Sequence, residues 1–283
     1  MLSIKLSDGM GNQMFQYALY REKDKNGIKV FLDTSYFERK ESKSFSLNVF
    51  KGVKFNELRE KSLYYHERFI PKRIIRLLLK LVRYIYYEKI NLGFDCHVMQ
   101  KQNGILVGYF QNEMYFSSVY DELRNDFEFI IKDDSLKWYI KYLDMQQNTV
   151  SIHVRRGDYV QLSNLYGGIC TPNYYVNAIA RMNLMLDNPK YIVLSNDMEW
   201  AKENLRIPNA NYILSKEFDG YEDWYDMCIM SHCKHNIIAN SSFSWWGAWL
   251  NPNKSKIVMC PTKWDNVTGG RKVKCRDWIE IQS

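Results

Sequence analysis

The sequence lacks any long apolar run. No stretch of about 18 uncharged apolar residues occurs in the chain, so no membrane-spanning helix is expected. The N-terminal segment carries Lys5 and then Asp8, which leaves no apolar core long enough for a signal peptide. These absences predict a soluble protein of the cytoplasm.

Paired cysteine spacings are also missing. The chain has 6 cysteines and no C-x-x-C, and a protein of this size needs no disulfides to fold, which fits a reducing compartment. Cys228, His232 and His235 stand three or four residues apart, as metal ligands on a helix can. Free cysteines are far more often buried as small apolar groups, so we expect this segment to face a core.

No arginine-rich tail or nucleic-acid-binding signature accompanies the net charge of +7. A positive balance still favours anionic partners. We therefore expect no nucleic acid, and a phosphate-bearing small molecule or a membrane surface instead.

Short apolar segments alternate with helical patterns along the chain. This rhythm predicts an α/β protein with parallel sheets covered on both faces. The polar run Gln146-Gln147-Asn148 marks a boundary between domains 1–147 and 148–283. Strands are expected at 2–6, 29–32, 105–110, 149–154, 191–194, 211–214, 236–239 and 256–259, the last closing the sheet. Helices are expected at 71–89, 119–127, 172–185, 198–205, 224–233 and 245–250.

Unusual polar residues follow several of these strands. Ligands of open α/β sheets bind beyond the carboxyl ends of the strands, which makes such residues candidates for a binding site. The segments are Gly9-Met10-Gly11-Asn12-Gln13, His153-Val154-Arg155-Arg156-Gly157-Asp158, Ser195-Asn196-Asp197 and Asn240-Ser241-Ser242-Phe243-Ser244.

Two adjacent arginines stand where the strand 149–154 ends. The planar fork of arginine stays charged and pairs with phosphate oxygens, so Arg155 and Arg156 can hold a diphosphate. Gly157 lets the backbone turn away from a ligand, and Asp158 can hold an arginine fork or accept from a ligand hydroxyl. Solvated arginines at an exposed strand end are the alternative interpretation.

A serine-rich segment precedes the helix expected at 245–250. Unpaired amides and hydroxyls at a helix start form an anion site, and capping alone explains one serine rather than Ser241, Ser242 and Ser244 together. The loop Gly9–Gln13 can also cradle phosphate. It lacks the third glycine of the dinucleotide fingerprint and the Lys-Ser/Thr of a P-loop.

Four blocks in series resemble the bacterial α-1,2-fucosyltransferases of glycosyltransferase family 11. They are GMGNQMFQYA at 9–18, HVRRGDY at 153–159, YIVLSND at 191–197 and NSSFSWWGAWL at 240–250. The resemblance implies a GT-B architecture, two Rossmann-like domains facing across a cleft, with GDP-β-L-fucose as donor and no metal or other cofactor. The C-terminal domain would bind GDP-fucose and the N-terminal domain the acceptor. Asp8 departs from the family, which more often has glycine there.

The resemblance also implies roles for single residues. Without a metal ion, protein cations must stabilise the departing GDP, and Arg155 would meet its β-phosphate, ordered with Arg156 by Asp158. Asp226 is the candidate for recognising guanine, with an ordinary helix N-terminal charge as the alternative. Further substrate contacts are expected from Gly11, Asn12, Gln13, His153, Asn196, Asp197, Ser241, Ser242, Phe243 and Ser244.

Transfer with inversion would turn the β-linked donor into an α-fucoside. Asp158 and Asp8 are the candidate general bases, and a loose oxocarbenium-like path with little base assistance is the alternative. The expected acceptor is O2 of a terminal galactoside in a surface polysaccharide or O-antigen. Another linkage, another GDP-sugar, or a non-catalytic binding protein on the same fold are the competing interpretations.

The helix expected at 71–89 carries basic residues beside an apolar stripe. Lys72, Arg76, Lys80 and Arg83 follow one flank of it. A solvated helix face explains this pattern, and so does a peripheral contact with anionic lipid that brings the enzyme to a lipid-linked acceptor.

Overall fold

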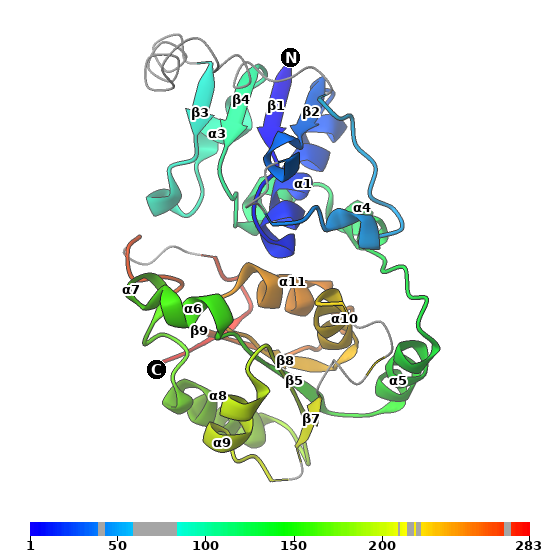
Figure 1. The fold of residues 1–283 in the computed structure, drawn as a ribbon, viewed down its shortest axis with the longest axis vertical. Coiled ribbons are helices and arrows are strands. Elements are labelled where there is room, and N and C mark those ends of the chain that lie inside the picture. The colour runs from blue at the N-terminus through cyan, green and yellow to red at the C-terminus, as the bar shows by residue number, and fades with distance from the viewer. Residues whose placement is uncertain (39–42, 59–83, 209, 214–217, 219–221, 269–272) are drawn as a thin grey trace. The chain divides into compact units, whose positions relative to one another are not determined.

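The chain forms two compact α/β units, Met1–Glu128 and Phe129–Ser283, each with its own parallel sheet (Figure 1). The structure is a computed structural model. It describes residues 1–38, 43–58, 84–208, 210–213, 218, 222–268 and 273–283, and the side chain of Asp158 lies outside that description.

The first unit is built on a sheet with the strand order β2-β1-β4-β3. Leu2 and Ile4 of the central strand β1 are fully buried, as are Phe15 and Ala18 of the helix that follows it. The strands are β1 (Leu2–Lys5), β2 (Val30–Asp33), β3 (Ile85–Tyr87) and β4 (Gly104–Val107). The helices are α1 (Met10–Lys25), α3 (Cys96–Gln100) and α4 (Tyr120–Asp126), with 3-10 turns at Ser35–Glu38, Leu47–Val49, Ile90–Leu92 and Glu113–Phe116.

Strand β3 corrects the end of the helix predicted at 71–89. Ile85 pairs with Ile105 and Tyr87 with Val107, in parallel register with β4. Aromatic and β-branched residues fit a half-buried pleated surface. The pairing with β4 shows that this segment is a strand rather than the end of a helix. The remaining part of that predicted helix, with Lys72, Arg76, Lys80 and Arg83, lies outside the described residues.

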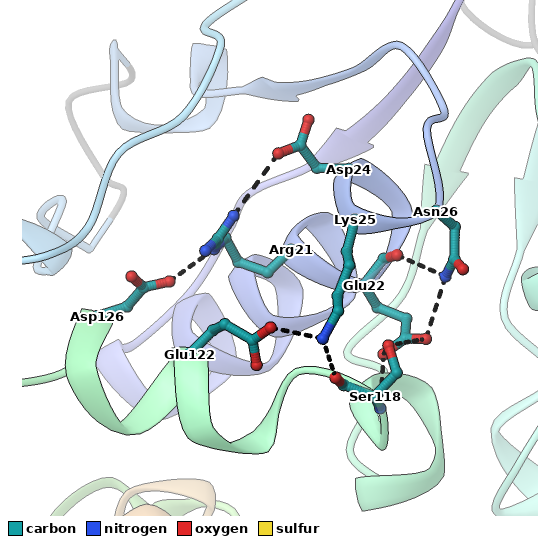
Figure 2. A network of polar contacts seen from close by, with 8 residues as sticks. All are labelled: Arg21, Glu22, Asp24, Lys25, Asn26, Ser118, Glu122 and Asp126. Atoms are coloured by element: carbon teal, nitrogen blue, oxygen red, sulfur yellow. Dashed lines mark hydrogen bonds and ion pairs between the residues drawn. The ribbon is translucent and has the colours of Figure 1, made fainter.

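A polar network attaches the second half of α1 to α4 and to the turn before it (Figure 2). Arg21 Nε lies 2.6 Å from Asp126 Oδ2, and Lys25 Nζ lies 2.5 Å from Glu122 Oε1. The Glu22 carboxylate accepts from the amide and the hydroxyl of Ser118, at 3.0 and 2.9 Å. These contacts fix the direction of α1, and with it the loop that joins α1 to β1.

The second unit has a sheet with the order β10-β9-β8-β5-β6-β7, all of it parallel. The core packs Val150, Ile152 and Val154 of β5 against Tyr175 and Ala178 of α8. The strands are β5 (Thr149–Val154), β6 (Lys190–Ser195), β7 (Asn211–Ile213), β8 (His235–Ile237), β9 (Val258–Pro261) and β10 (Ile279–Ile281). The helices are α5 (Asp134–Met145), α6 (Gly157–Gln161), α7 (Ser163–Tyr166), α8 (Pro172–Met185), α9 (Met198–Asn204), α10 (Trp224–His232) and α11 (Ser242–Leu250).

The division between the units falls earlier than the boundary predicted at 147. Helix α5 belongs to the second unit because it packs on α10. Asp144 of α5 is bound twice there: its carboxylate lies 2.9 Å from His232 Nδ1, and its carbonyl accepts from Lys234 Nζ at 3.0 Å. Polar residues at 146–148 mark a turn inside this unit rather than its start.

Two further sequence predictions for the second unit were wrong in detail. The strand predicted at 256–259 does not close the sheet, because β10 pairs beyond it, with Ile279 opposite Met259. Helix α11 begins at Ser242 rather than at Trp245. The earlier start of α11 places Ser242 and Ser244 within its first helical turn instead of in a loop.

The cysteines differ in exposure between the units. Cys96 of the first unit is exposed, whereas Cys228, Cys233, Cys260 and Cys275 of the second are buried. His232 pairs with Asp144, and His235 Nδ1 accepts from the amide of Ile257 at 3.0 Å, so the histidines near Cys228 have separate partners. Over the described ranges, no group of three metal-ligating side chains occurs and no helix is long and apolar enough to cross a membrane.

Candidate active site

The second sheet reverses its strand order beside β5. The chain runs outward from β5 to β6 and β7, then returns to the other side of β5 for β8, β9 and β10. The carboxyl ends of strands at such a reversal bound the crevice where α/β proteins bind ligands. Here those ends carry Arg155 after β5 and Asn240 with the start of α11 after β8.

Arg155 lies over an aromatic pair. Its guanidinium carbon is 5.5 Å from the centre of the Tyr159 ring, and that ring stacks on Tyr166 at 4.3 Å. The Tyr159 hydroxyl donates to the carbonyl of Asn240 at 3.0 Å. Arg155 is therefore linked through one side chain to the segment that enters α11.

The start of α11 suits an anion. Ser241, at the N-cap, makes no capping hydrogen bond with its side chain, and no acidic residue stands in the first turn. Ser242 and Phe243 are partly exposed. The positive end of the helix dipole, the first-turn amides and the serine hydroxyls together form a candidate anion site, linked to Arg155 through Tyr159.

His153 is a structural link between β5 and α11. It is 3% exposed, its Nδ1 lies 2.5 Å from Ser244 Oγ, and its carbonyl accepts from the Tyr175 hydroxyl at 3.2 Å. Burial, with a smaller contribution from the charge of Arg155, lowers the pKa of His153 to about 3, so the imidazole is neutral. Both His153 and Ser244 were expected to contact substrate, and the structure pairs them with each other.

Arg156 turns toward α9. Its Nε donates to Asp197 Oδ2 at 3.0 Å, its guanidinium carbon is 4.2 Å from the centre of the Trp200 ring, and its amide donates to Asn196 Oδ1 at 3.0 Å. Asp197 also caps α9 by accepting from the Trp200 amide at 3.3 Å. Asp197 is thus a carboxylate that holds Arg156. The side chain of Asp158 lies outside the described residues, so its ordering of the two arginines stays a prediction.

Gly157 is required by a close approach. A Cβ atom at this position would lie 2.1 Å from Asn196 Nδ2, and the residue has φ of +20°. Any larger residue displaces Asn196, which in turn holds the amide of Arg156. The glycine of the motif therefore serves the packing of two strand ends.

Asp226 lies in the first turn of α10 and is buried. Helix α10 packs against α11, so the carboxylate belongs to the same unit as the anion site. Trp224, the first residue of α10, stacks on Phe129 with ring centres 5.4 Å apart. Recognition of guanine by Asp226 stays a prediction.

The predicted residues of the first unit form a separate group. Gly11, Asn12 and Gln13 lie in the first turn of α1, not in a loop. Gln13 Nε2 donates to the carbonyls of Asp8 and Ser44, at 2.7 and 2.9 Å, and its Oε1 accepts from the Ser46 amide at 2.9 Å. Asn12 Oδ1 lies 2.5 Å from Gln111 Nε2. These side chains bind neighbouring segments of the first unit, and their contact with substrate stays a prediction.

Sequence reasoning assigned no role to three residues of this site. Tyr159 ends the arginine motif and Trp200 follows the Ser-Asn-Asp segment, so the only signal was an aromatic residue close to an arginine. Asn240 was grouped with the serines. It is 2% exposed, and its side chain donates to the Trp264 carbonyl at 3.1 Å and lies 3.4 Å from Cys170 Sγ.

Two α/β units in series, with an anion site at the strand reversal of the second, are the architecture of GT-B glycosyltransferases. The chain belongs to glycosyl transferase family 11, which it matches over residues 1–282. It is 34% identical to the O-antigen biosynthesis glycosyltransferase WbnK of Escherichia coli, with 98% of this chain and 99% of that protein aligned. An alpha-1,2-colitosyltransferase of Escherichia coli is 32% identical, with coverage of 92% and 91%.

A solved structure supports the fold. The fucosyltransferase NodZ from Bradyrhizobium superposes with a TM-score of 0.50 at 13% identity, covering 89% of this chain and 92% of that one. The predicted fold class, α/β with the GT-B architecture, is confirmed, as is membership of family 11. The protein is a glycosyltransferase of that family.

Proposed function

We propose that the protein transfers L-fucose from GDP-β-L-fucose, with inversion and without a metal ion, to O2 of a terminal galactoside. The family and the α-1,2 linkage in the name of one relative support this linkage class. The name of the other relative supports a place in O-antigen biosynthesis. The acceptor is then an oligosaccharide of a surface glycan, reached in the cytoplasm.

One observation carries the proposal: Arg155 and the start of α11 share the strand reversal of the second sheet. A nucleoside diphosphate gains negative charge on its β-phosphate as the sugar bond breaks. A guanidinium fork and a helix N-terminus are fixed donors for that charge and need no reorganisation during the reaction. Arg155 is therefore the proposed catalytic residue, and the hydroxyls of Ser241 and Ser242 take further phosphate oxygens.

The acceptor hydroxyl must lose its proton during transfer. Asp158 follows the arginine motif, and Asp8 lies at the end of β1 with φ of +65°, where the Tyr36 hydroxyl lies 3.3 Å from its Oδ1. We propose one of these carboxylates as general base, with Asp158 the first to be tested. A leaving group that is strongly stabilised by Arg155 reduces the demand on that base.

Peripheral binding to the membrane is a separate proposal. A lipid-linked acceptor would place the reaction at an anionic surface, which attracts basic segments by about 1 kcal/mol per residue. The helix predicted at 71–89 is the candidate, and co-sedimentation with anionic vesicles at low and high salt tests it. Binding that is unchanged after Lys72, Arg76, Lys80 and Arg83 become Gln overturns it.

The activity is tested by incubating the purified protein with GDP-fucose and a β-galactoside, followed by linkage analysis of the product. An α-1,2-fucosyl galactoside is the expected product. Transfer to another hydroxyl, or transfer from a GDP-linked colitose alone, replaces the proposed substrates but keeps the class. Binding of GDP-fucose with neither transfer nor hydrolysis identifies a non-catalytic protein on the same fold.

A further inference from the structure

Tyr159 joins the two halves of the anion site. Its ring lies under the guanidinium of Arg155, and its hydroxyl donates to the carbonyl of Asn240. Asn240 directly precedes Ser241, the N-cap of α11. The Tyr159 ring therefore contacts Arg155, and the Tyr159 hydroxyl contacts the segment that leads into α11.

Asn240 is held from two other directions as well. Its side-chain amide donates to the carbonyl of Trp264, beyond β9, and its Oδ1 lies 3.4 Å from Cys170 Sγ, just before α8. A segment fixed in this way is a rigid anchor for the Tyr159 hydroxyl. The ring of Tyr166 stacks on that of Tyr159 and restrains it further.

We propose that Tyr159 is a positioning residue that sets the Arg155 guanidinium relative to the start of α11, so that both donors meet the same diphosphate. The inference rests on the proposed function, because it requires a nucleoside diphosphate at this edge of the sheet. A long arginine side chain has many rotamers, and a ring beneath it reduces the entropy lost when the guanidinium binds phosphate. Loss of Tyr159 then weakens the phosphate contacts without removing any of them.

The two parts of this role are separated by two substitutions. Tyr159→Phe keeps the ring under Arg155 and removes the hydrogen bond to Asn240, so GDP affinity should fall about 5-fold. Tyr159→Leu removes both contacts, so GDP affinity should fall about 30-fold. GMP lacks the β-phosphate, and its affinity should stay within about 2-fold of the wild-type value.

Tyr174 provides the matched control. Its hydroxyl also donates to a carbonyl of the segment after β8, that of Ile238 at 2.6 Å, and its ring packs edge to face on Tyr175. Tyr174→Phe makes the same chemical change two residues earlier in that segment. It should lower the melting temperature and leave GDP affinity unchanged.

The experiment measures GDP and GMP affinity by calorimetry for the wild type and the three variants, together with donor and acceptor KM. A rise in donor KM with constant acceptor KM supports the inference, and a merely structural defect would not separate the two. Equal losses for GDP and GMP, or wild-type GDP affinity in Tyr159→Phe and Tyr159→Leu, overturn it. If Tyr159→Leu fails to fold, Tyr159→Phe against Tyr174→Phe decides alone. A wild-type protein that binds no GDP overturns the proposed function as well.

Discussion

Both sheets are parallel and reverse their strand order beside their first strand, and they differ in what occupies the reversal. In the first unit the order changes between β1 and β4, and in the second between β5 and β8. Gln16 bridges the ends of β1 and β4, at the reversal of the first sheet. Its Oε1 accepts from the Ser7 amide at 2.8 Å after β1, and its Nε2 donates to the Gly108 carbonyl at 3.0 Å after β4.

The second unit has no such amide bridge among the described contacts of this edge, and it carries a cation instead. Arg155 is linked through Tyr159 to the entry to α11, whereas Gln13 and Gln16 of α1 are bound to backbone groups of the first unit. A strand reversal and a helix start therefore indicate only where a ligand could bind. Charge, and polar groups that are not already committed to backbone partners, decide whether one binds there.

The largest expected effect concerns the cation. Arg155→Ala should lower kcat/KM by about 10³-fold or more, since a preorganised donor at a developing charge contributes about 10²- to 10³-fold and Arg155 is charged as well. Arg181→Ala, which removes an exposed arginine from α8, is the matched control for loss of charge. Wild-type turnover in Arg155→Ala would show that transfer does not depend on the cation at the reversal of the second sheet.

Loss of the Gln16 amide bridge in the first unit should lower stability and leave nucleotide binding unchanged. Gln16→Ala leaves the Ser7 amide and the Gly108 carbonyl without their partner in a buried place, which should cost about 2–3 kcal/mol of unfolding free energy. Urea unfolding measures that loss, and calorimetry should find GDP affinity unchanged. A fall in GDP affinity would mean that the nucleotide also uses the first unit.

Arg156→Lys tests whether the second arginine acts on phosphate or on its neighbours. A lysine cannot stack on Trp200 and pair with Asp197 in the same forked geometry, so we expect kcat/KM to fall about 10-fold. The ion pair is partly exposed and contributes less than about 1 kcal/mol to stability. Asp197→Asn should reproduce the defect if Arg156 acts through α9, and should not if Arg156 binds substrate itself.

His153 predicts a pH dependence of stability. Its pKa of about 3 in the folded protein lies below the usual value near 6.5, so the unfolded chain binds more protons between these limits. Stability is therefore complete above about pH 6.5 and falls as the pH drops toward 3, by at most about 1.4 kcal/mol per pH unit from this group. Unfolding at pH 7 and pH 5 should show a smaller difference in His153→Gln than in the wild type.

Chelation should have the smallest effect. With arginine in the place of a metal ion, EDTA should leave the rate of transfer within about 2-fold of the control. Loss of activity that Mn²⁺ restores would show that the second sheet does not stabilise GDP by protein cations alone.

Much of the second unit could be predicted from sequence because its strands are continuous apolar runs. Strand β5 at 149–154 and helix α8 at 172–185 have the predicted bounds. Strand β10 was missed because Ile279-Glu280-Ile281 is short and alternating, and only its pairing with β9 shows that it is a strand. Strand β3 was missed for a related reason, since only pairing with β4 shows that a helical period does not continue through Ile85.

The site was predicted less completely than the fold. A motif gives types of residue, and HVRRGDY drew attention to the end of β5. Which partner each side chain takes depends on contacts between distant segments: His153 with Ser244, Arg156 with Asp197, and Tyr159 with Asn240. No spacing within the sequence specifies these pairs.

The distribution of thiols makes the protein easy to label at one place. Cys96 is exposed on the first unit, whereas burial raises the pKa of Cys170 and Cys260 to about 12 and leaves them largely unreactive at neutral pH. A maleimide dye should therefore attach to Cys96 of the native protein without prior mutation. With a fluorescent GDP analogue as the second dye, energy transfer to the dye on Cys96 would measure how the first unit responds when nucleotide binds.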